Sequence, residues 1–205
     1  MQTARIISLV SMRHAALNAA ARPLLRGMSR ASGIAASVIM PTCNKATYLD
    51  LTLATLEHQI FPADLWELIV IDDASADTTP QVLKFFEDRG RLPLVHRRPA
   101  KNRGRAGARN DALALARGHV VIFLDDDRLT APDFLLQHTL RHRGDPGVVH
   151  GNTTRRIHTH QPPFVTREEV MRPGRLQPLV SLYIDSRTYL ETAEAFHRRA
   201  WAGSS

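Results

Sequence analysis

Short apolar runs alternate with helix-period segments between residues 37 and 151, and this alternation constrains the fold more than any other feature. The first run, residues 38–40, is followed by apolar side chains at steps of four, three and four, namely Leu49, Leu53, Leu56 and Ile60. Such spacing places side chains on one face of a helix. Further short strands are expected at residues 67–71, 92–96 and 120–124. Strands that alternate with helices predict an α/β fold with a mainly parallel sheet sandwiched between helices.

Capping and helix-breaking residues predict where the other elements begin and end. Thr79 and Pro80 suit the N-cap and the first position of a helix, and Gly118 is expected to end a helix over about 106–117. Pro132 is expected to start a helix that runs to about residue 141. Weaker signals suggest a fifth strand at 147–150, a strand at 179–184 and a terminal helix at 188–201. The sheet could therefore be incomplete at the C-terminus.

The distribution of charge divides the chain into three parts. The formal net charge is +7, but residues 1–36 hold five arginines and no acid, while residues 37–154 hold 14 bases against 15 acids. We expect a basic, poorly ordered extension over 1–36, a central domain over 37–151, and a short, poorly defined segment over 152–205. The composition of the extension also allows a transit peptide or a membrane-surface helix.

Composition also limits the classes of function. The single cysteine excludes an intrachain disulfide framework and a zinc site built from several thiolates. No apolar stretch approaches the roughly 18 residues of a membrane-spanning helix. A cytoplasmic location with at most peripheral membrane contact is the expectation. Because the central region is nearly neutral, a role as a nucleic-acid or membrane adaptor would rest on the flanks alone, and no nucleic-acid partner is expected.

Carboxylates follow two of the apolar runs. Ligands in open α/β sheets bind beyond the carboxyl ends of strands, and Asp125, Asp126 and Asp127 lie at such an end. Three adjacent carboxylates repel one another unless a cation, hydrogen bonds or water offset the repulsion. In extended geometry Asp125 and Asp127 face the same side, and oxygen ligands of this kind suit Mg²⁺ or Mn²⁺. The alternative is a solvated acidic loop.

A second pair of carboxylates, Asp72 and Asp73, follows the run at 67–71. These residues could accept N–H groups of a nucleotide, or, with Ser75 and Asp77, could form an Asx turn and cap a helix. The basic, glycine-containing stretch 101–110 precedes and opens a helix, where backbone donors and the helix dipole favour phosphate. The stretch lacks the Gly-Lys-Ser/Thr ending of a P-loop.

Four motifs follow one another in the central region. They are Ser-Val-Ile-Met-Pro-Thr-Cys-Asn at 37–44, Glu-Leu-Ile-Val-Ile-Asp-Asp-Ala-Ser-Ala-Asp at 67–77, Asn-Arg-Gly through Arg-Asn at 102–110, and Phe-Leu-Asp-Asp-Asp at 123–127. Together these motifs resemble the inverting family 2 glycosyltransferases of the GT-A fold. Their order and spacing match the family over residues 37–151. The resemblance implies a nucleotide-sugar-binding half with a Rossmann-like parallel sheet.

The resemblance also implies how the base would be held. Pro41, Thr42 and Asn44 would form the loop under the nucleotide base, with Cys43 at a position where the family usually has tyrosine. Asp73, in preference to Asp72, would then bind the base.

Arg109 would reach the nucleotide, and the three strand-end aspartates would hold the rest of the donor. Asp125 and Asp126 would contact ribose and diphosphate. Asp127, assisted by Asp125, would ligate Mg²⁺ or Mn²⁺ bridging the diphosphate.

The implied activity is transfer of a sugar, with inversion and metal assistance, from a nucleoside-diphosphate sugar to an acceptor hydroxyl of a glycan, lipid or small molecule. Such a transfer needs a base that deprotonates the acceptor, and no residue of 152–205 matches the family's pattern. The carboxylates there and the pair His158 and His160 fit an exposed surface better than a site. The catalytic base is unknown, so the alternative is a truncated or degenerate member that binds nucleotide sugar without transferring it.

Overall fold

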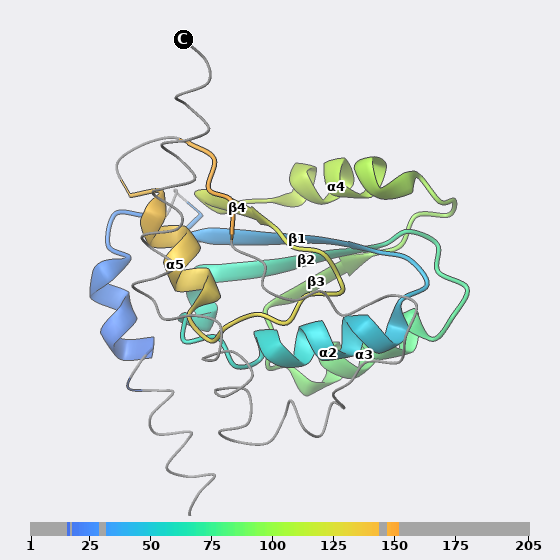
Figure 1. Cartoon of the computed structure of the whole chain (residues 1–205), viewed down its shortest axis with the longest axis horizontal. Helices are drawn as coiled ribbons and strands as arrows, with labels where there is room; N and C mark the ends of the chain where they lie inside the picture. The colour runs from blue at the N-terminus through green and yellow to red at the C-terminus, as the bar shows by residue number, and fades with distance from the viewer. Residues whose placement is uncertain (1–15, 17, 29–31, 144–146, 152–205) are drawn as a thin grey trace, which may run out of the picture.

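The computed structural model describes residues 16, 18–28, 32–143 and 147–151, and the sheet lies at its centre (Figure 1). Strands β1 (Ala36–Thr42), β2 (Trp66–Asp72), β3 (Leu94–Arg97) and β4 (Val120–Phe123) pair in the order β3-β2-β1-β4. Every pairing is parallel. The predicted α/β fold with a mainly parallel sheet is confirmed.

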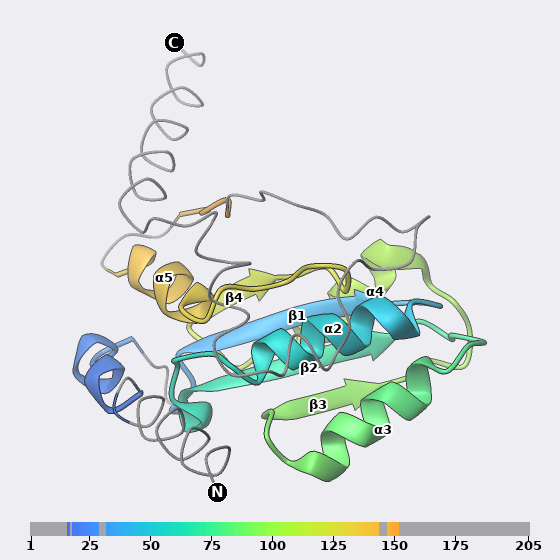
Figure 2. The same ribbon diagram turned by 60° about the horizontal axis from the view of Figure 1, so that its bottom comes forward.

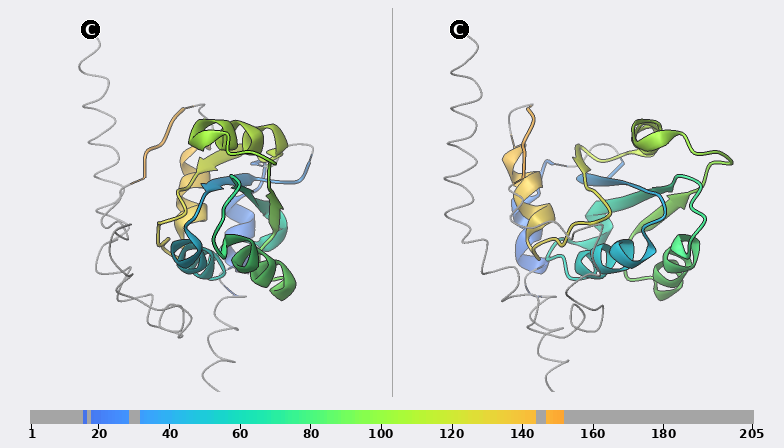
Figure 3. Two further views of the ribbon diagram at one scale, coloured as in Figure 1. Left: turned by 90° about the vertical axis from the view of Figure 1, so that its right-hand side faces the viewer. Right: turned by 45° about the vertical axis from the view of Figure 1, so that its right-hand side comes forward.

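Helices cover both faces of this sheet. Helices α2 (Ala46–Leu56) and α3 (Thr79–Arg89) lie side by side on one face, and α4 (Gly104–Leu115) lies on the other (Figures 1 and 3). A 3₁₀ turn, η1 (Ala63–Leu65), precedes β2, and α5 (Phe134–Arg141) lies near the end of the sheet where the strands begin (Figure 2). The parallel strands therefore all point their carboxyl ends toward the opposite edge.

The core explains why the strands are apolar runs rather than alternating sequences. Alternate residues of β1 and β2 pack into a large cluster with α2 and α3, whereas Ile39, Ile69 and Ile71 face α4. There they meet Ala108 and Ala112, whose short side chains let α4 lie close to the sheet. Because both faces of each central strand are buried, seven consecutive positions of β1 and of β2 are buried.

Part of the N-terminal segment, which we expected to lie outside the domain, packs against the core. Residues 18–24 are helical, and Leu25 and Met28 belong to the main buried cluster with 4% and 3% of their surface exposed. On the outside, Arg22 forms a two-pronged ion pair with Asp64 at 2.6 and 2.9 Å. The buried residues Ala21, Leu25 and Met28 are spaced by four and three positions, a helical pattern that the overall composition of the segment does not show.

Several predicted boundaries shift. The third strand begins at Leu94 instead of residue 92, and α3 has Thr78 as its N-cap, which moves Thr79 and Pro80 into the first turn. Residues 147–150 form no strand, and Val148 is 88% exposed. The strand and helix predicted at 179–184 and 188–201 lie outside the described residues.

Gly118 has a different role from the predicted helix stop. Helix α4 ends at Leu115, and Gly118 lies against the start of β1, where its N–H donates to Ser37 Oγ at 2.8 Å. A Cβ atom on Gly118 would lie 2.5 Å from the Ser37 nitrogen and 2.6 Å from the Ala36 carbonyl carbon. The glycine is required by this close backbone approach.

In the described part of the chain, no helix is long and apolar enough to cross a membrane.

Histidine burial in α5 predicts a pH-dependent stability. Burial, with smaller contributions from His142 and His150, lowers the pKa of His138 to about 4. In the unfolded chain the imidazole takes up a proton near pH 6.5, so the free energy of unfolding should fall as the pH drops from 6.5 to 4, by about 3 kcal/mol. Urea unfolding at several pH values across this range measures how the free energy of unfolding changes with pH. His138→Gln should remove most of this pH dependence, whereas substitution of the exposed His119 by Gln should keep it. An unchanged pH dependence in His138→Gln would contradict the assignment.

Candidate functional site

A cavity of about 450 Å³ lies at the carboxyl edge of the sheet, where β1, β2 and β4 end. Its lining combines the ends of these strands with the start of α4, and comprises Pro41, Thr42, Cys43, Lys45, Asp73, Asn102, Gly104, Arg105, Ala108, Asp125, Asp126 and Asp127. The segments that carry the predicted site residues therefore meet in space. Of the predicted residues, Asn44, Asp72 and Arg109 are not part of this lining.

Asp72 holds its own loop together through its side chain. Its Oδ1 accepts the N–H of Ser75 at 3.0 Å, its Oδ2 lies 3.3 Å from an Arg98 guanidinium nitrogen, and its side chain is 1% exposed. The turn forces Ala74 to a φ of 61°. This geometry fits a turn at Asp72, and contact of Asp72 with a nucleotide base stays a prediction.

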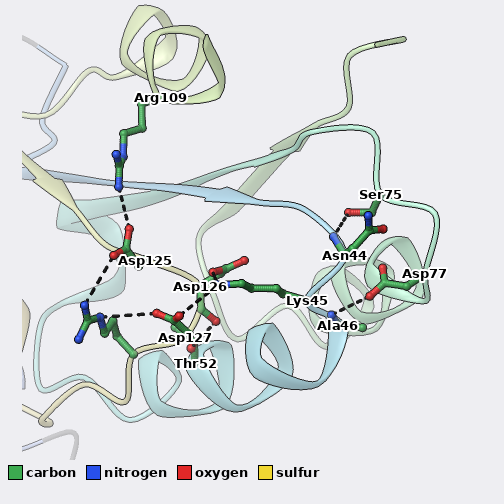
Figure 4. A network of polar contacts seen from close by, with 11 residues as sticks. Asn44, Lys45, Ala46, Thr52, Ser75, Asp77, Arg109, Asp125, Asp126 and Asp127 are labelled. Atoms are coloured by element: carbon green, nitrogen blue, oxygen red, sulfur yellow. Dashed lines mark hydrogen bonds and ion pairs between the residues drawn. The ribbon is translucent and has the colours of Figure 1, made fainter. Parts of the chain in front are cut away.

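Asn44 joins the loop after β1 to the loop after β2 (Figure 4). Its N–H donates to Ser75 Oγ at 2.9 Å, and its Oδ1 accepts the N–H of Ala76 at 2.6 Å. Its φ of 53° is in the left-handed region, which asparagine tolerates better than most residues. Asn44 thereby fixes the shape of the loop that carries Cys43 and Lys45 into the cavity.

Asp77 caps two helices with one carboxylate. Its Oδ2 accepts the N–H of Ala46 in α2 at 3.0 Å, and its Oδ1 accepts the N–H of Thr79 in α3 at 2.9 Å. Burial acts to raise the pKa of Asp77, but these hydrogen bonds outweigh it and hold the pKa below its ordinary value. Asp77 therefore fixes both helices that flank the cavity loops.

Asp77→Ala should lower the free energy of unfolding by about 1–2 kcal/mol, because two helix N-termini lose their side-chain acceptor. The lowered pKa means that this stabilisation is full above about pH 4 and is lost as the pH falls through the folded-state pKa. Urea unfolding at pH 7 measures the change. Asp88→Ala, which removes an exposed carboxylate of α3 paired with Lys84, is the matched control and should cost less than about 0.5 kcal/mol. Equal losses in both variants would contradict the capping role.

Asp73, unlike Asp72, reaches the cavity. Its Oδ1 accepts the N–H of Arg103 at 2.7 Å, and its carbonyl oxygen accepts the Asn102 side chain at 3.0 Å. These bonds tie the end of β2 to the start of α4. Burial first, and the Asp73 charge second, raise the pKa of the Cys43 thiol, which contacts the Asp73 carbonyl oxygen at 3.4 Å.

The three strand-end aspartates have different surroundings (Figure 4). Asp125, one third exposed, accepts Arg109 Nη2 at 2.7 Å. The Asp126 side chain is 7% exposed, and its carbonyl oxygen accepts Thr52 Oγ1 at 2.9 Å. Burial raises the pKa of Asp126 despite its pairing with Lys45. Asp126 is therefore fixed to α2, whereas Asp125 is open to the cavity.

Cations of the chain itself balance this acidic cluster. Lys45 Nζ lies 3.3 Å from Asp126 Oδ1 and 3.1 Å from Asp127 Oδ2. Arg128 Nε lies 3.6 Å from Asp127 Oδ1, and another Arg128 nitrogen lies 3.8 Å from Asp125 Oδ2. Burial acts to lower the pKa of Lys45, but the two carboxylates raise it above its ordinary value, so the ammonium stays charged.

The carboxylates at the cavity suit a divalent cation whose coordination shell is completed by a bound phosphate. Asp125 and Asp127 present carboxylate oxygens at the cavity, and Mg²⁺ or Mn²⁺ commonly takes one or two carboxylates together with phosphate oxygens. Within the described residues, no group of three or more histidine, cysteine or acidic side chains has a metal-binding arrangement. The remaining ligands would come from a bound phosphate and from water.

Comparison with known proteins decides the family. The family model described as "Glycosyl transferase family 2" matches residues 37–200. The chain belongs to glycosyl transferase family 2.

Individual relatives of this family match shorter stretches. Validoxylamine A glucosyltransferase of Streptomyces hygroscopicus subsp. jinggangensis is 34% identical over 67% of this chain, and the glycosyltransferase YfnE of Bacillus subtilis is 38% identical over 56%. The aligned regions span 35% and 28% of those two proteins. The solved structure of mannosyltransferase PcManGT from Pyrobaculum calidifontis, in complex with GDP-Man and Mn²⁺, is 28% identical, with a TM-score of 0.51 over 71% of this chain and 45% of that one. The likeness to this solved structure, together with the parallel sheet and its covering helices, agrees with the GT-A fold expected from the four motifs.

The motifs of this family 2 member did not identify every residue at the cavity. Lys45 and Arg128 lie outside the four motifs but take part in the polar network, whereas Asn102, which opens the third motif, bonds the Asp73 carbonyl oxygen. Lys45 directly follows a predicted loop residue, and Arg128 directly follows the aspartates, so adjacency to the motifs was the available signal. The candidate base carboxylates and His158 and His160 lie outside the described residues.

Proposed function

We propose that this family 2 chain binds a nucleoside-diphosphate sugar in the cavity at the carboxyl edge of the sheet and transfers the sugar, with inversion, to an acceptor hydroxyl. The observation that carries the proposal is the convergence of Asp73, Asp125 and Asp127 on one cavity. Two relatives, a glucosyltransferase and a mannosyltransferase in complex with GDP-Man and Mn²⁺, support a donor of this class.

The base is assigned to the part of the cavity formed by the ends of β1 and β2, and the ribose to Asp125 and Asp126. Pro41 and Thr42, both buried at the end of β1, would form the floor under the base, and Asp73 would accept N–H groups from it. The Asp73 Oδ1 already accepts one backbone N–H, which leaves its second oxygen for this contact. Cys43 stands beside this position with a small, neutral side chain.

The diphosphate is assigned to the region between the aspartates and the start of α4. The N-terminus of α4 carries partial positive charge, and Gly104 and Arg105 bring it to the cavity wall. Arg109 holds Asp125 by an ion pair and keeps that carboxylate at the wall. Asp125 and Asp127 would hold Mg²⁺ or Mn²⁺, which when bound supplies positive charge for the departing diphosphate.

This arrangement lets the sugar leave without protonation of the leaving group. Cationic groups and the helix dipole meet the negative charge that develops on the phosphate as the glycosidic bond breaks. Inversion requires the acceptor to attack from the opposite side of the sugar while a base removes its proton. We assign the donor half of this reaction to residues 37–151.

Donor turnover tests the proposal. The protein should be incubated with Mn²⁺ and UDP-glucose, UDP-N-acetylglucosamine or GDP-mannose, and release of nucleoside diphosphate should be followed by chromatography. The proposal predicts slow, metal-dependent release from at least one donor, accelerated by an acceptor with a free hydroxyl. Donor binding with no release across a broad acceptor panel would contradict the transfer activity.

A further inference from the structure

The ammonium group of Lys45 lies between two aspartates of the acidic cluster. The loop after β1 carries Lys45 to the N-terminus of α2, and its side chain extends to the aspartates at the end of β4 (Figure 4). Its ammonium bridges Asp126 and Asp127 at 3.3 and 3.1 Å, and 24% of the side chain is exposed. A protein cation therefore already stands between two carboxylates at the cavity wall.

Asp127 has a cation at each of its oxygens. Lys45 approaches Oδ2, and Arg128 approaches Oδ1 at 3.6 Å. A divalent ion that ligates Asp127 comes within a few ångströms of the ammonium, where like charges repel strongly in a partly buried site. Lys45 has a flexible four-carbon side chain that lines the open cavity, so it is the group that can move away.

We propose that Lys45 is a resident counter-ion that competes with the divalent cation for Asp127, and so weakens the metal affinity of the free protein. This inference rests on the proposed function, which makes Asp127 a metal ligand. Without metal, Lys45 offsets the repulsion between Asp126 and Asp127. When metal binds Asp127, the ammonium withdraws into the cavity, where a donor diphosphate is an acceptor for its three N–H groups. Metal binding is thereby coupled to donor binding.

Titration of the protein with Mn²⁺ alone tests the competition. Free Mn²⁺ is measured by its electron paramagnetic resonance signal in the presence of the wild-type protein, Lys45→Met and Lys45→Arg. We expect Mn²⁺ to bind Lys45→Met about tenfold more tightly than wild type, because the competing charge is absent. Lys45→Arg, which keeps a cation on a side chain of similar length, should stay within about threefold of wild type.

A second variant that also removes one positive charge from the cavity separates direct competition for Asp127 from a general change in the electrostatic potential of the cavity. Arg105 lines the same cavity, and the ion pairs of the described residues do not join it to the three aspartates. Arg105→Met removes the same charge and should change Mn²⁺ affinity less than about twofold. An equal gain in Arg105→Met and Lys45→Met would overturn the competition, as would unchanged affinity in a Lys45→Met protein with a cooperative thermal transition.

The double variant Lys45→Met/Asp127→Asn locates the gained affinity. The inference predicts that this variant loses the tight Mn²⁺ binding of Lys45→Met. Retention of tight binding would place the ion elsewhere and overturn the inference. Failure of the proposed metal site has a different signature, because no variant, wild type included, would then bind Mn²⁺ whether or not nucleoside diphosphate is present.

Discussion

Asp127→Asn is expected to weaken metal-dependent binding of a nucleoside diphosphate about 100-fold. The substitution preserves shape but removes the negative charge that a divalent cation requires, and it leaves Lys45 and Arg128 facing a neutral amide. Isothermal titration calorimetry with UDP or GDP, in the presence and absence of Mn²⁺, measures the loss. Binding without Mn²⁺ should change much less, because the proposed base contacts of Pro41, Thr42 and Asp73 do not involve the metal.

The control for this variant is Asp88→Asn, which neutralises an exposed carboxylate on α3. Its metal-dependent affinity should equal that of the wild type. If Asp127→Asn binds nucleoside diphosphate and Mn²⁺ as tightly as Asp88→Asn, Asp127 is not the metal ligand.

Gly118→Ala is expected to lower the free energy of unfolding by about 3 kcal/mol or more. The added Cβ would meet the backbone of β1 at 2.5 and 2.6 Å, and β1 is a central strand that cannot move without disturbing both neighbours. The clash also reaches Ser37 Oγ, which donates to the buried Glu67 at 2.7 Å. Glu67 is further held by three hydrogen bonds from Arg117, and burial acts to raise its pKa while these bonds lower it below the ordinary value.

Urea unfolding compares Gly118→Ala with Gly147→Ala. A Cβ on Gly147 meets nothing within 4 Å, so that variant should change stability by less than about 0.5 kcal/mol. Equal stability of the two variants would show that the β1 contact tolerates a methyl group, against the geometry described above.

The strands and the place of the cavity were predictable because burial on both faces leaves a strong signal. Residues 38–40 and 68–71 are apolar without interruption, since each central strand contacts helices on both sides. Parallel strands bring their carboxyl ends to one edge, so residues that follow different strands meet there. The sequence alone therefore predicts that Asp73 and Asp125 lie at one site.

Side-chain directions and long-range contacts were not predictable in the same way. Asp72 and Asp73 are neighbours in the sequence, but their side chains point in different directions. The Asp72 carboxylate accepts a backbone N–H of its own loop, whereas the Asp73 carboxylate accepts one at the start of α4. Lys45 meets Asp127 across 82 positions of the chain, which no local pattern reports. Leu25 and Met28 enter the core although the segment that holds them stands out in the sequence by its five arginines and its lack of acidic residues.

The central claim is that the aspartates at the end of β4, together with a divalent cation, bind the diphosphate of a nucleotide sugar. The most direct test is calorimetric titration of the wild-type protein with UDP and with GDP, each with and without Mn²⁺. The account predicts one site per chain for at least one of the two nucleotides, with affinity at least tenfold higher when Mn²⁺ is present. Absence of binding to both nucleotides, or binding that Mn²⁺ leaves unchanged, would contradict it.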